Sequence, residues 1–199
     1  MNLKPRMLAF ALVASLAAPA FAQTSQQDQT RQAQRDAHQQ QRIEQGLHSG
    51  QLTPKEAGRL EREESRIDRM QAHAAANGRV TPAEQARINT AESQASRNIA
   101  TDRHNAVIGN PNSASSQRMQ ADVRRDARQE QRIAQGVESG ALTTREAGRL
   151  DRQQARTDRM EASAAANGRI SAREQARIQH SEDRHSRHIY RQKHDRQMR

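Results

Sequence analysis

The chain has 199 residues, of which 33% are hydrophobic and only 2% aromatic, with no cysteine and a formal net charge of +10. This composition excludes disulfides and a large apolar core. A chain with so few large aliphatic residues and an appreciable net charge tends toward disorder. Abundant alanine, glutamine, arginine and glutamate instead favour helices, so we predict marginal helices around a thin core.

Residues 1–22 have the three parts of a secretory signal. Lys4 and Arg6 give a positive start, an apolar run extends from about residue 7 to residue 18, and Ala20-Phe21-Ala22 forms a cleavage site. The run is far shorter than the roughly 20 residues needed to span a bilayer. We therefore predict cleavage between Ala22 and Gln23, a periplasmic or secreted protein, and no transmembrane segment after cleavage.

The rest of the chain contains one unit twice. Residues 35–104 match residues 125–194 at an offset of 90 without a gap, and 40 of the 70 positions are identical. Glycine, asparagine, proline and serine between the copies indicate a linker. The predicted organisation is a signal peptide (1–22), a first unit (23–108), a linker (109–117) and a second unit (118–199).

Each unit contains two short segments that predict the end of one helix and the start of the next. At the first, Gly50 can end a helix, Thr53 can cap the next one, Pro54 suits its first position, and Glu56 completes a capping box. The same signals predict six helices, near residues 28–48, 54–76, 82–106, 119–138, 144–166 and 172–196. The fold class is therefore all-α: two tandem copies of a three-helix unit with partly disordered ends.

Apolar residues form narrow stripes on these helices. Leu60, Ile67, Met70 and Ala74 share one face of the second helix. Such thin seams suit helical hairpins or a small bundle, and we expect self-association or a partner to complete them.

Both glycine signals in each unit resemble the second half of a calcium-binding EF-hand loop. Gly78 and Gly168 are followed six residues later by a glutamate, which gives candidate ligands at Asn77 and Glu84, and at Asn167 and Glu174. The front half of the loop does not fit, because alanine occupies a ligand position. Helix capping explains the glycine, the N-cap residue and the glutamate of this pattern without an ion.

Histidines gather near the C-terminus and are candidate ligands for zinc or copper. The candidates are His180, His185, His188 and His194. His185 and His188 share a helix face at a three-residue spacing, which suits chelation. Alternatively, His185 lies on the apolar seam and the others are solvated, and the basic surroundings disfavour a cation.

The excess positive charge is spread along all the helices among acidic residues, which is typical of solvated surfaces and would attract anionic envelope components. The carboxylates are accordingly predicted on helix surfaces, with ordinary pKa values. No aromatic platform or reading motif indicates nucleic-acid binding. No catalytic grouping or phosphate loop is present, so we expect neither an enzyme nor a cofactor.

The chain resembles two protein families, the first through a five-residue motif and the second over nearly all of the mature chain. Residues 52–56 (LTPKE) and 142–146 (LTTRE) resemble the LTxxQ motif of the Spy and CpxP periplasmic stress proteins, with glutamate in place of glutamine. The unit and its end at residues 186–195 also look like a recurring exported family of proteobacteria without an assigned function. These likenesses imply an exported helical protein, and the first implies stress-chaperone activity.

Three functions remain open from the sequence. The leading hypothesis is a non-enzymatic envelope protein that binds other proteins or anionic envelope components, with a weak, chaperone-like hold on clients. The alternatives are a zinc- or copper-binding protein that uses the C-terminal histidines, and a self-associating structural protein or degenerate EF-hand-like calcium protein.

Overall fold

We describe the protein from a computed structural model, which covers the backbone of residues 18–195 and the side chains of residues 27–195. The predicted disordered ends and most of the predicted signal peptide lie outside the described residues. The first helix begins at Ala18, so that cleavage after Ala22 would remove its first residues.

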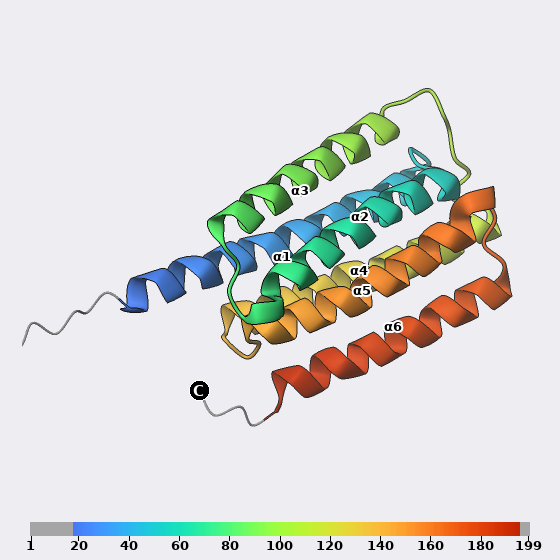
Figure 1. Ribbon diagram of the computed structural model, residues 1–199. Helices are drawn as coiled ribbons and strands as arrows, with labels where there is room; N and C mark the ends of the chain where they lie inside the picture. The colour runs from blue at the N-terminus through green and yellow to red at the C-terminus, as the bar shows by residue number, and fades with distance from the viewer. Residues whose placement is uncertain (1–17, 196–199) are drawn as a thin grey trace, which may run out of the picture.

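The described chain is all-α, as predicted, and contains no strand (Figure 1). The six helices are α1 (Ala18–Ser49), α2 (Pro54–Ala74), α3 (Pro82–Arg103), α4 (Ala114–Glu138), α5 (Thr144–Ala164) and α6 (Ala172–Lys193). Short 3₁₀ turns, Ala75–Asn77 and Ala165–Asn167, extend α2 and α5.

Local sequence signals set the ends of these helices. The Thr53 backbone N–H donates to Glu56 Oε2 at 2.9 Å, and Glu56 N–H donates to Thr53 Oγ1 at 3.2 Å, which makes a capping box. Thr81, Thr143 and Ser171 cap α3, α5 and α6 in the same way. The preceding turns use Gly50, Gly78, Gly140 and Gly168, all at positive φ. Capping predicted from sequence is therefore confirmed at all four helix starts.

Several helix ends differ from their predicted positions: α1 begins at Ala18 instead of near residue 28, α3 and α6 end three residues earlier than predicted, and α4 begins five residues earlier. The early start of α4 also shortens the linker. The sequence predicts that it extends to residue 117, but α4 begins at Ala114 because the Ser113 side chain accepts a hydrogen bond from the backbone N–H of Ser116. The serine-rich stretch thus supplies an N-cap and a first helical turn.

The two sequence units pack against each other. Four helices form the centre, with α1 against α4 and α2 against α5, while α3 and α6 lie on opposite outer sides (Figure 1). The pairs are antiparallel: Gln120 Nε2, near the start of α4, donates to the Leu47 carbonyl near the end of α1 at 3.4 Å. Each unit therefore buries its inner face against the other copy.

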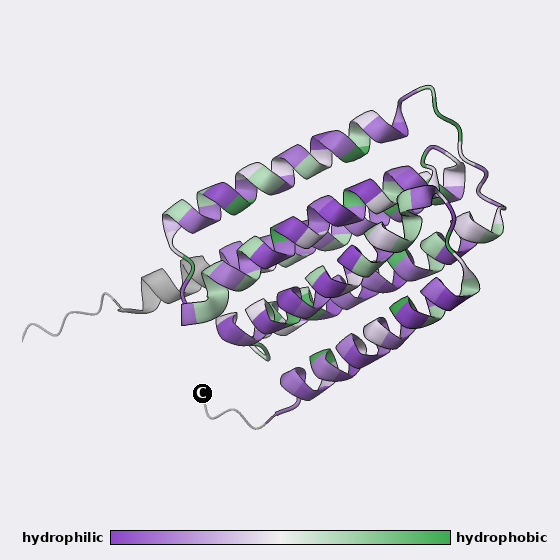
Figure 2. Ribbon diagram, turned by 45° about the vertical axis from the view of Figure 1, so that its right-hand side comes forward, coloured by the Kyte–Doolittle hydropathy of each residue, from purple (hydrophilic) through white to green (hydrophobic). Residues whose placement is uncertain are grey.

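Apolar packing is concentrated in two clusters related by the duplication. The larger includes Ile43, Leu47, Leu52, Leu60 and Ile99. The smaller includes their counterparts Ile133, Val137, Leu142, Leu150 and Ile189. Because the paired helices are antiparallel, the two clusters lie toward opposite ends of the bundle. The helices are otherwise largely hydrophilic (Figure 2).

Between the apolar clusters the inner faces of the helices are polar. On α2, Glu61, Glu64, Asp68 and Gln71 follow one another at spacings of three or four residues, and all four are buried. This places carboxyl and amide groups at positions where a bundle ordinarily packs aliphatic side chains.

Candidate functional site: a carboxylate core

Many carboxyl groups are buried in the interior of the bundle. Besides the capping residues Glu56 and Glu146, eleven are buried: Asp36, Glu61, Glu64, Asp68, Glu92, Asp122, Asp126, Glu130, Asp158, Glu161 and Glu182. No lysine or arginine is buried anywhere in residues 27–195. The core therefore lacks the internal cations that would neutralise these groups if they were ionised.

Three of these carboxylates converge on one point. Glu61 of α2, Asp126 of α4 and Glu161 of α5 each offer an oxygen, and the three oxygens lie within 4.8 Å of one another. Glu61 Oε2 accepts a hydrogen bond from Gln40 Nε2 at 2.9 Å. Neither oxygen of Glu161 has a hydrogen-bond partner. We call Glu61, Asp126 and Glu161 the carboxylate triad.

Burial raises the pKa of every member of the triad. It raises the pKa of Asp126 to about 6, and a proton on the Glu161 carboxyl, together with Gln154 and Arg125, favours the charged form of Asp126 and keeps the value from rising further. The pKa values of Glu61 and Glu161 lie well above their ordinary range, because burial and neighbouring acids, Asp126 among them, both disfavour ionisation. The triad thus tends to hold protons when nothing else supplies positive charge.

Arg125 pairs with acids that neighbour the triad and interacts electrostatically with Asp126. Arg125 Nε lies 3.0 Å from Glu182 Oε2, and Arg125 Nη1 donates to Asp183 Oδ1 at 2.8 Å. Burial and the nearby Asp126 and Asp122 nevertheless raise the pKa of Glu182 to about 10, because they outweigh this half-exposed guanidinium. One arginine therefore does not balance the acids around the triad.

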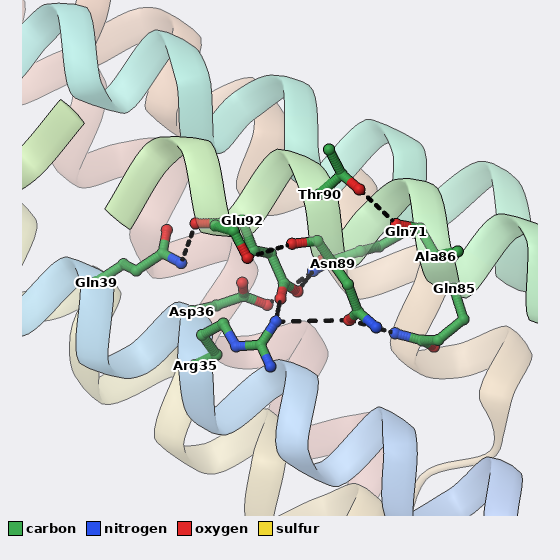
Figure 3. A network of polar contacts seen from close by, with 10 residues as sticks. Arg35, Asp36, Gln39, Gln71, Gln85, Ala86, Asn89, Thr90 and Glu92 are labelled. Carbon is green, nitrogen blue, oxygen red and sulfur yellow. Dashed lines mark hydrogen bonds and ion pairs between the residues drawn. The ribbon is translucent and has the colours of Figure 1, made fainter. Parts of the chain in front are cut away.

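The duplication gives the triad a counterpart formed by Asp36, Gln71 and Asp151. Here an amide stands where the triad has Glu161, and Gln71 Nε2 donates to Asp36 Oδ2 at 2.9 Å and to Glu92 Oε1 at 3.4 Å. Arg35 pairs with Glu92 as Arg125 pairs with Glu182 (Figure 3). A cavity of about 30 Å³ adjoins Asp36, Gln71 and Asp151, and burial raises the pKa of Asp151 to about 8.

The four candidate histidines lie along α6 and its end, in different environments. His180 and His194 are exposed, and His194 Nδ1 bonds to the Tyr190 carbonyl at 2.7 Å. His188 is half-buried. His185 is buried on the seam of α6, where burial lowers its pKa to about 3. Within the described part of the chain, the triad alone brings three potential metal-binding side chains together.

The four calcium-like positions are engaged in turns and caps. Asn77 Oδ1 accepts from the Arg79 backbone N–H, and Asn167 Oδ1 from that of Arg169, both at 2.8 Å. Glu84 and Glu174 accept from the backbone and side chain of Thr81 and Ser171. The asparagine oxygens therefore stabilise turns, and the glutamate oxygens cap the starts of α3 and α6.

The triad is not among the sequence-based candidates. Its members are 65 and 35 residues apart and come from both units, so no local motif contains them. A signal is present, because Glu61, Glu64, Asp68 and Gln71 recur at helical spacing, as do Asp151, Gln154, Asp158 and Glu161. The prediction that carboxylates lie on helix surfaces with ordinary pKa values is wrong for this inner stripe.

Comparison of the chain with models of protein families, with curated proteins and with solved structures finds no match. Among the described helices, none has a stretch long and apolar enough to cross a membrane.

Proposed function

We propose that this protein is an exported, non-enzymatic metal-binding protein that holds a hard cation, such as Ca²⁺ or Mn²⁺, in the carboxylate triad. The observation that carries the proposal is the convergence of three buried carboxylates, two of which, Asp126 and Glu161, have no hydrogen-bond donor at either oxygen. Helical bundles commonly build metal sites from inward-facing carboxylates on different helices.

Charge supports the proposal. A buried carboxylate without a partner is costly, so it must either bind a proton or meet a positive charge. A cation at the triad would provide that charge at neutral pH and would release the protons held by Glu61 and Glu161. It would also offset the neighbouring acids that raise the pKa of both groups.

The geometry and the donor type restrict the class of ion. Ligand oxygens bound to one such cation lie about 3–5 Å apart, since each is about 2.1–2.5 Å from the ion. The 4.8 Å limit that encloses the three triad oxygens fits this range. An all-oxygen set favours calcium, magnesium or manganese over zinc or copper.

The rival functions have weaker support. A protein that holds unfolded clients on apolar stripes needs exposed apolar surface. Across residues 27–195, the large hydrophobic side chains that remain exposed are Val107, Ile108 and Tyr190. A zinc or copper site on α6 would need its histidines to converge, and His180 and His194 are fourteen residues apart on the helix and its end.

Native mass spectrometry of the purified protein, titrated separately with Mn²⁺, Ca²⁺ and Zn²⁺ at neutral pH, tests the proposal. We expect one tightly bound Mn²⁺ or Ca²⁺, and at least tenfold weaker binding in the Glu161→Gln variant. The control is His188→Asn, which should bind as the wild type does. Loss of binding in His188→Asn with retention in Glu161→Gln would transfer the site to α6, and no bound ion in the wild type would refute the proposal.

A further inference from the structure

We infer that the duplication built two frameworks for an ion and that only the carboxylate triad is used, because the Gln71 amide takes the place of a cation in the other. This inference rests on the proposed function and adds to it the residues that determine how many ions the protein binds. The second framework consists of Asp36, Gln71 and Asp151, and we call it the amide framework.

Corresponding positions form the two frameworks. Asp36, Gln71 and Asp151 are separated from Asp126, Glu161 and Glu61 by 90 residues each, and both frameworks draw on both units. Asp36 lies close enough to Asp151 for the two charges to interact, and both adjoin one cavity. The backbone therefore presents three side chains to one point in each half of the bundle.

Residues 71 and 161 make the decisive difference. The NH₂ group of Gln71 donates to Asp36 and Glu92, so that it joins two carboxylates with partial positive charge. Glu161 occupies the equivalent position beside Asp126 and Glu182 but has no hydrogen to donate when ionised, and both its oxygens lack a hydrogen-bond partner. A protonated Glu161 can donate to only one neighbour, whereas the Gln71 amide donates to two, so a bound ion is what would join both groups in the triad.

Side-chain length makes the second difference. Asp151 stands where the triad has Glu61, and the shorter side chain keeps the amide framework from closing. A cavity of about 30 Å³ remains beside Asp36 and Asp151, which has room for about two water molecules. Gln40, which donates to Glu61 of the triad, has the buried Glu130 as its counterpart in the second unit. The amide framework is therefore acidic even without a glutamate at position 71.

The inference predicts how exchange of these residues changes stoichiometry. The variant Gln71→Glu/Asp151→Glu gives the amide framework the side chains of the triad, and the longer side chain at position 151 has the cavity to enter. The variant Glu161→Gln/Glu61→Asp gives the triad the side chains of the amide framework. The quadruple variant combines both pairs and exchanges the two frameworks.

Native mass spectrometry with Mn²⁺ and Ca²⁺ counts the bound ions, and circular dichroism checks that each variant is helical. We expect one ion in the wild type, two in Gln71→Glu/Asp151→Glu, none in Glu161→Gln/Glu61→Asp and one in the quadruple variant. The quadruple variant also guards against misfolding, because it regains an ion only if the amide framework has become the site.

The possible failures are distinguishable. Two ions in the wild type, or one ion in Gln71→Glu/Asp151→Glu when that variant is folded, would overturn the inference and leave the proposed function standing. No ion in the wild type would overturn both.

Discussion

The carboxyl group of Glu161 is the clearest case of a side chain that is costly in the ion-free fold. It is fully buried, its oxygens have no hydrogen-bond partner, and burial together with Asp126, Glu61 and Glu182 raises its pKa. An amide of the same shape removes the charge, whereas a metal ion would compensate for it. Stability without metal and affinity for metal should therefore change in opposite directions at this position.

We expect Glu161→Gln to stabilise the metal-free protein by about 1–3 kcal/mol at pH 8, because folding no longer has to protonate this glutamate or bury its charge. Urea unfolding in the presence of a chelator measures this change. The matched control is Glu174→Gln, at an exposed capping residue of α6, which should lower stability instead. A destabilised Glu161→Gln variant would show that Glu161 has a stabilising partner in the ion-free protein.

The buried acids also predict a pH dependence. Burial raises the pKa of Asp126 to about 6, of Glu92 and Asp122 to about 7, and of Asp151 to about 8, against ordinary values of 3.8 for aspartate and 4.5 for glutamate. The folded chain then holds protons that the unfolded chain releases. Stability from these groups is complete below the ordinary pKa values and is lost as the pH rises through the raised ones.

The free energy of unfolding of the metal-free protein should therefore fall between pH 6.5 and 8.5, by about 1.4 kcal/mol per pH unit for each group that stays protonated only when folded. Thermal unfolding should show this as a lower melting temperature at the higher pH. His185, with a pKa lowered to about 3, contributes in the opposite direction only below its ordinary value of 6.5. Saturating Mn²⁺ or Ca²⁺ should flatten the dependence. A stability that is constant or rises over this interval would contradict the raised pKa values.

At the scale of the elements, close approach of α2 and α5 brings the triad together. A Cβ atom on Gly58 would lie 2.6 Å from the Ala165 Cβ, and one on Gly148 would lie 2.5 Å from the Ala75 Cβ. The crossing also has Ser65 Oγ donating to the Ala155 carbonyl at 2.7 Å. Glycine is required at these two contacts because there is no space for a methyl group.

We expect Gly58→Ala to destabilise the protein by about 1–3 kcal/mol through overpacking, although alanine is the better helix former. It should also weaken metal binding, since Glu61 and Glu161 lie on the separated helices. The compensating variant Gly58→Ala/Ala165→Gly removes the colliding methyl group and should recover most of the stability. Denaturant unfolding measures both variants, and equal loss in the two would exclude the methyl contact as the cause.

At the scale of the whole molecule, the two sequence units depend on each other. The inner face of α1 packs on α4, and that of α2 on α5, so that a unit alone would expose both its apolar and its acidic side chains. The units are repeats in sequence but share one core.

A single unit, residues 114–199, should therefore be helical only when it pairs with a second copy of itself. We expect its helicity by circular dichroism to fall on dilution, and sedimentation to show a dimer at high concentration, because α4 and α5 regain their partners only between chains. The intact chain, whose partners are covalently linked, is the control and should keep its helicity on dilution. A monomeric, stably helical unit would contradict the shared core.

Local sequence alone determined the class of fold and the limits of most helices. Thr53, Thr81, Thr143 and Ser171 with their glutamates fix the helix starts through contacts three residues apart, which need no tertiary partner. The duplication is likewise recognised from the amino-acid sequence alone. For the same reason, the sequence alone predicts Glu84 as a capping residue, and its carboxylate accepts from the Thr81 backbone N–H.

Only the tertiary structure decided which acidic face is buried. The helical spacing of Glu61 and Asp68 shows that they share one face, but arginines and carboxylates alternate on every helix, so the pattern does not show whether that face is buried or solvated. Pairing of α2 with α5 and of α1 with α4 made that choice, and it joined Glu61 to residues 65 and 100 positions away. The carboxylate triad, like the raised pKa values around it, is a product of burial, and burial depends on contacts between the two copies.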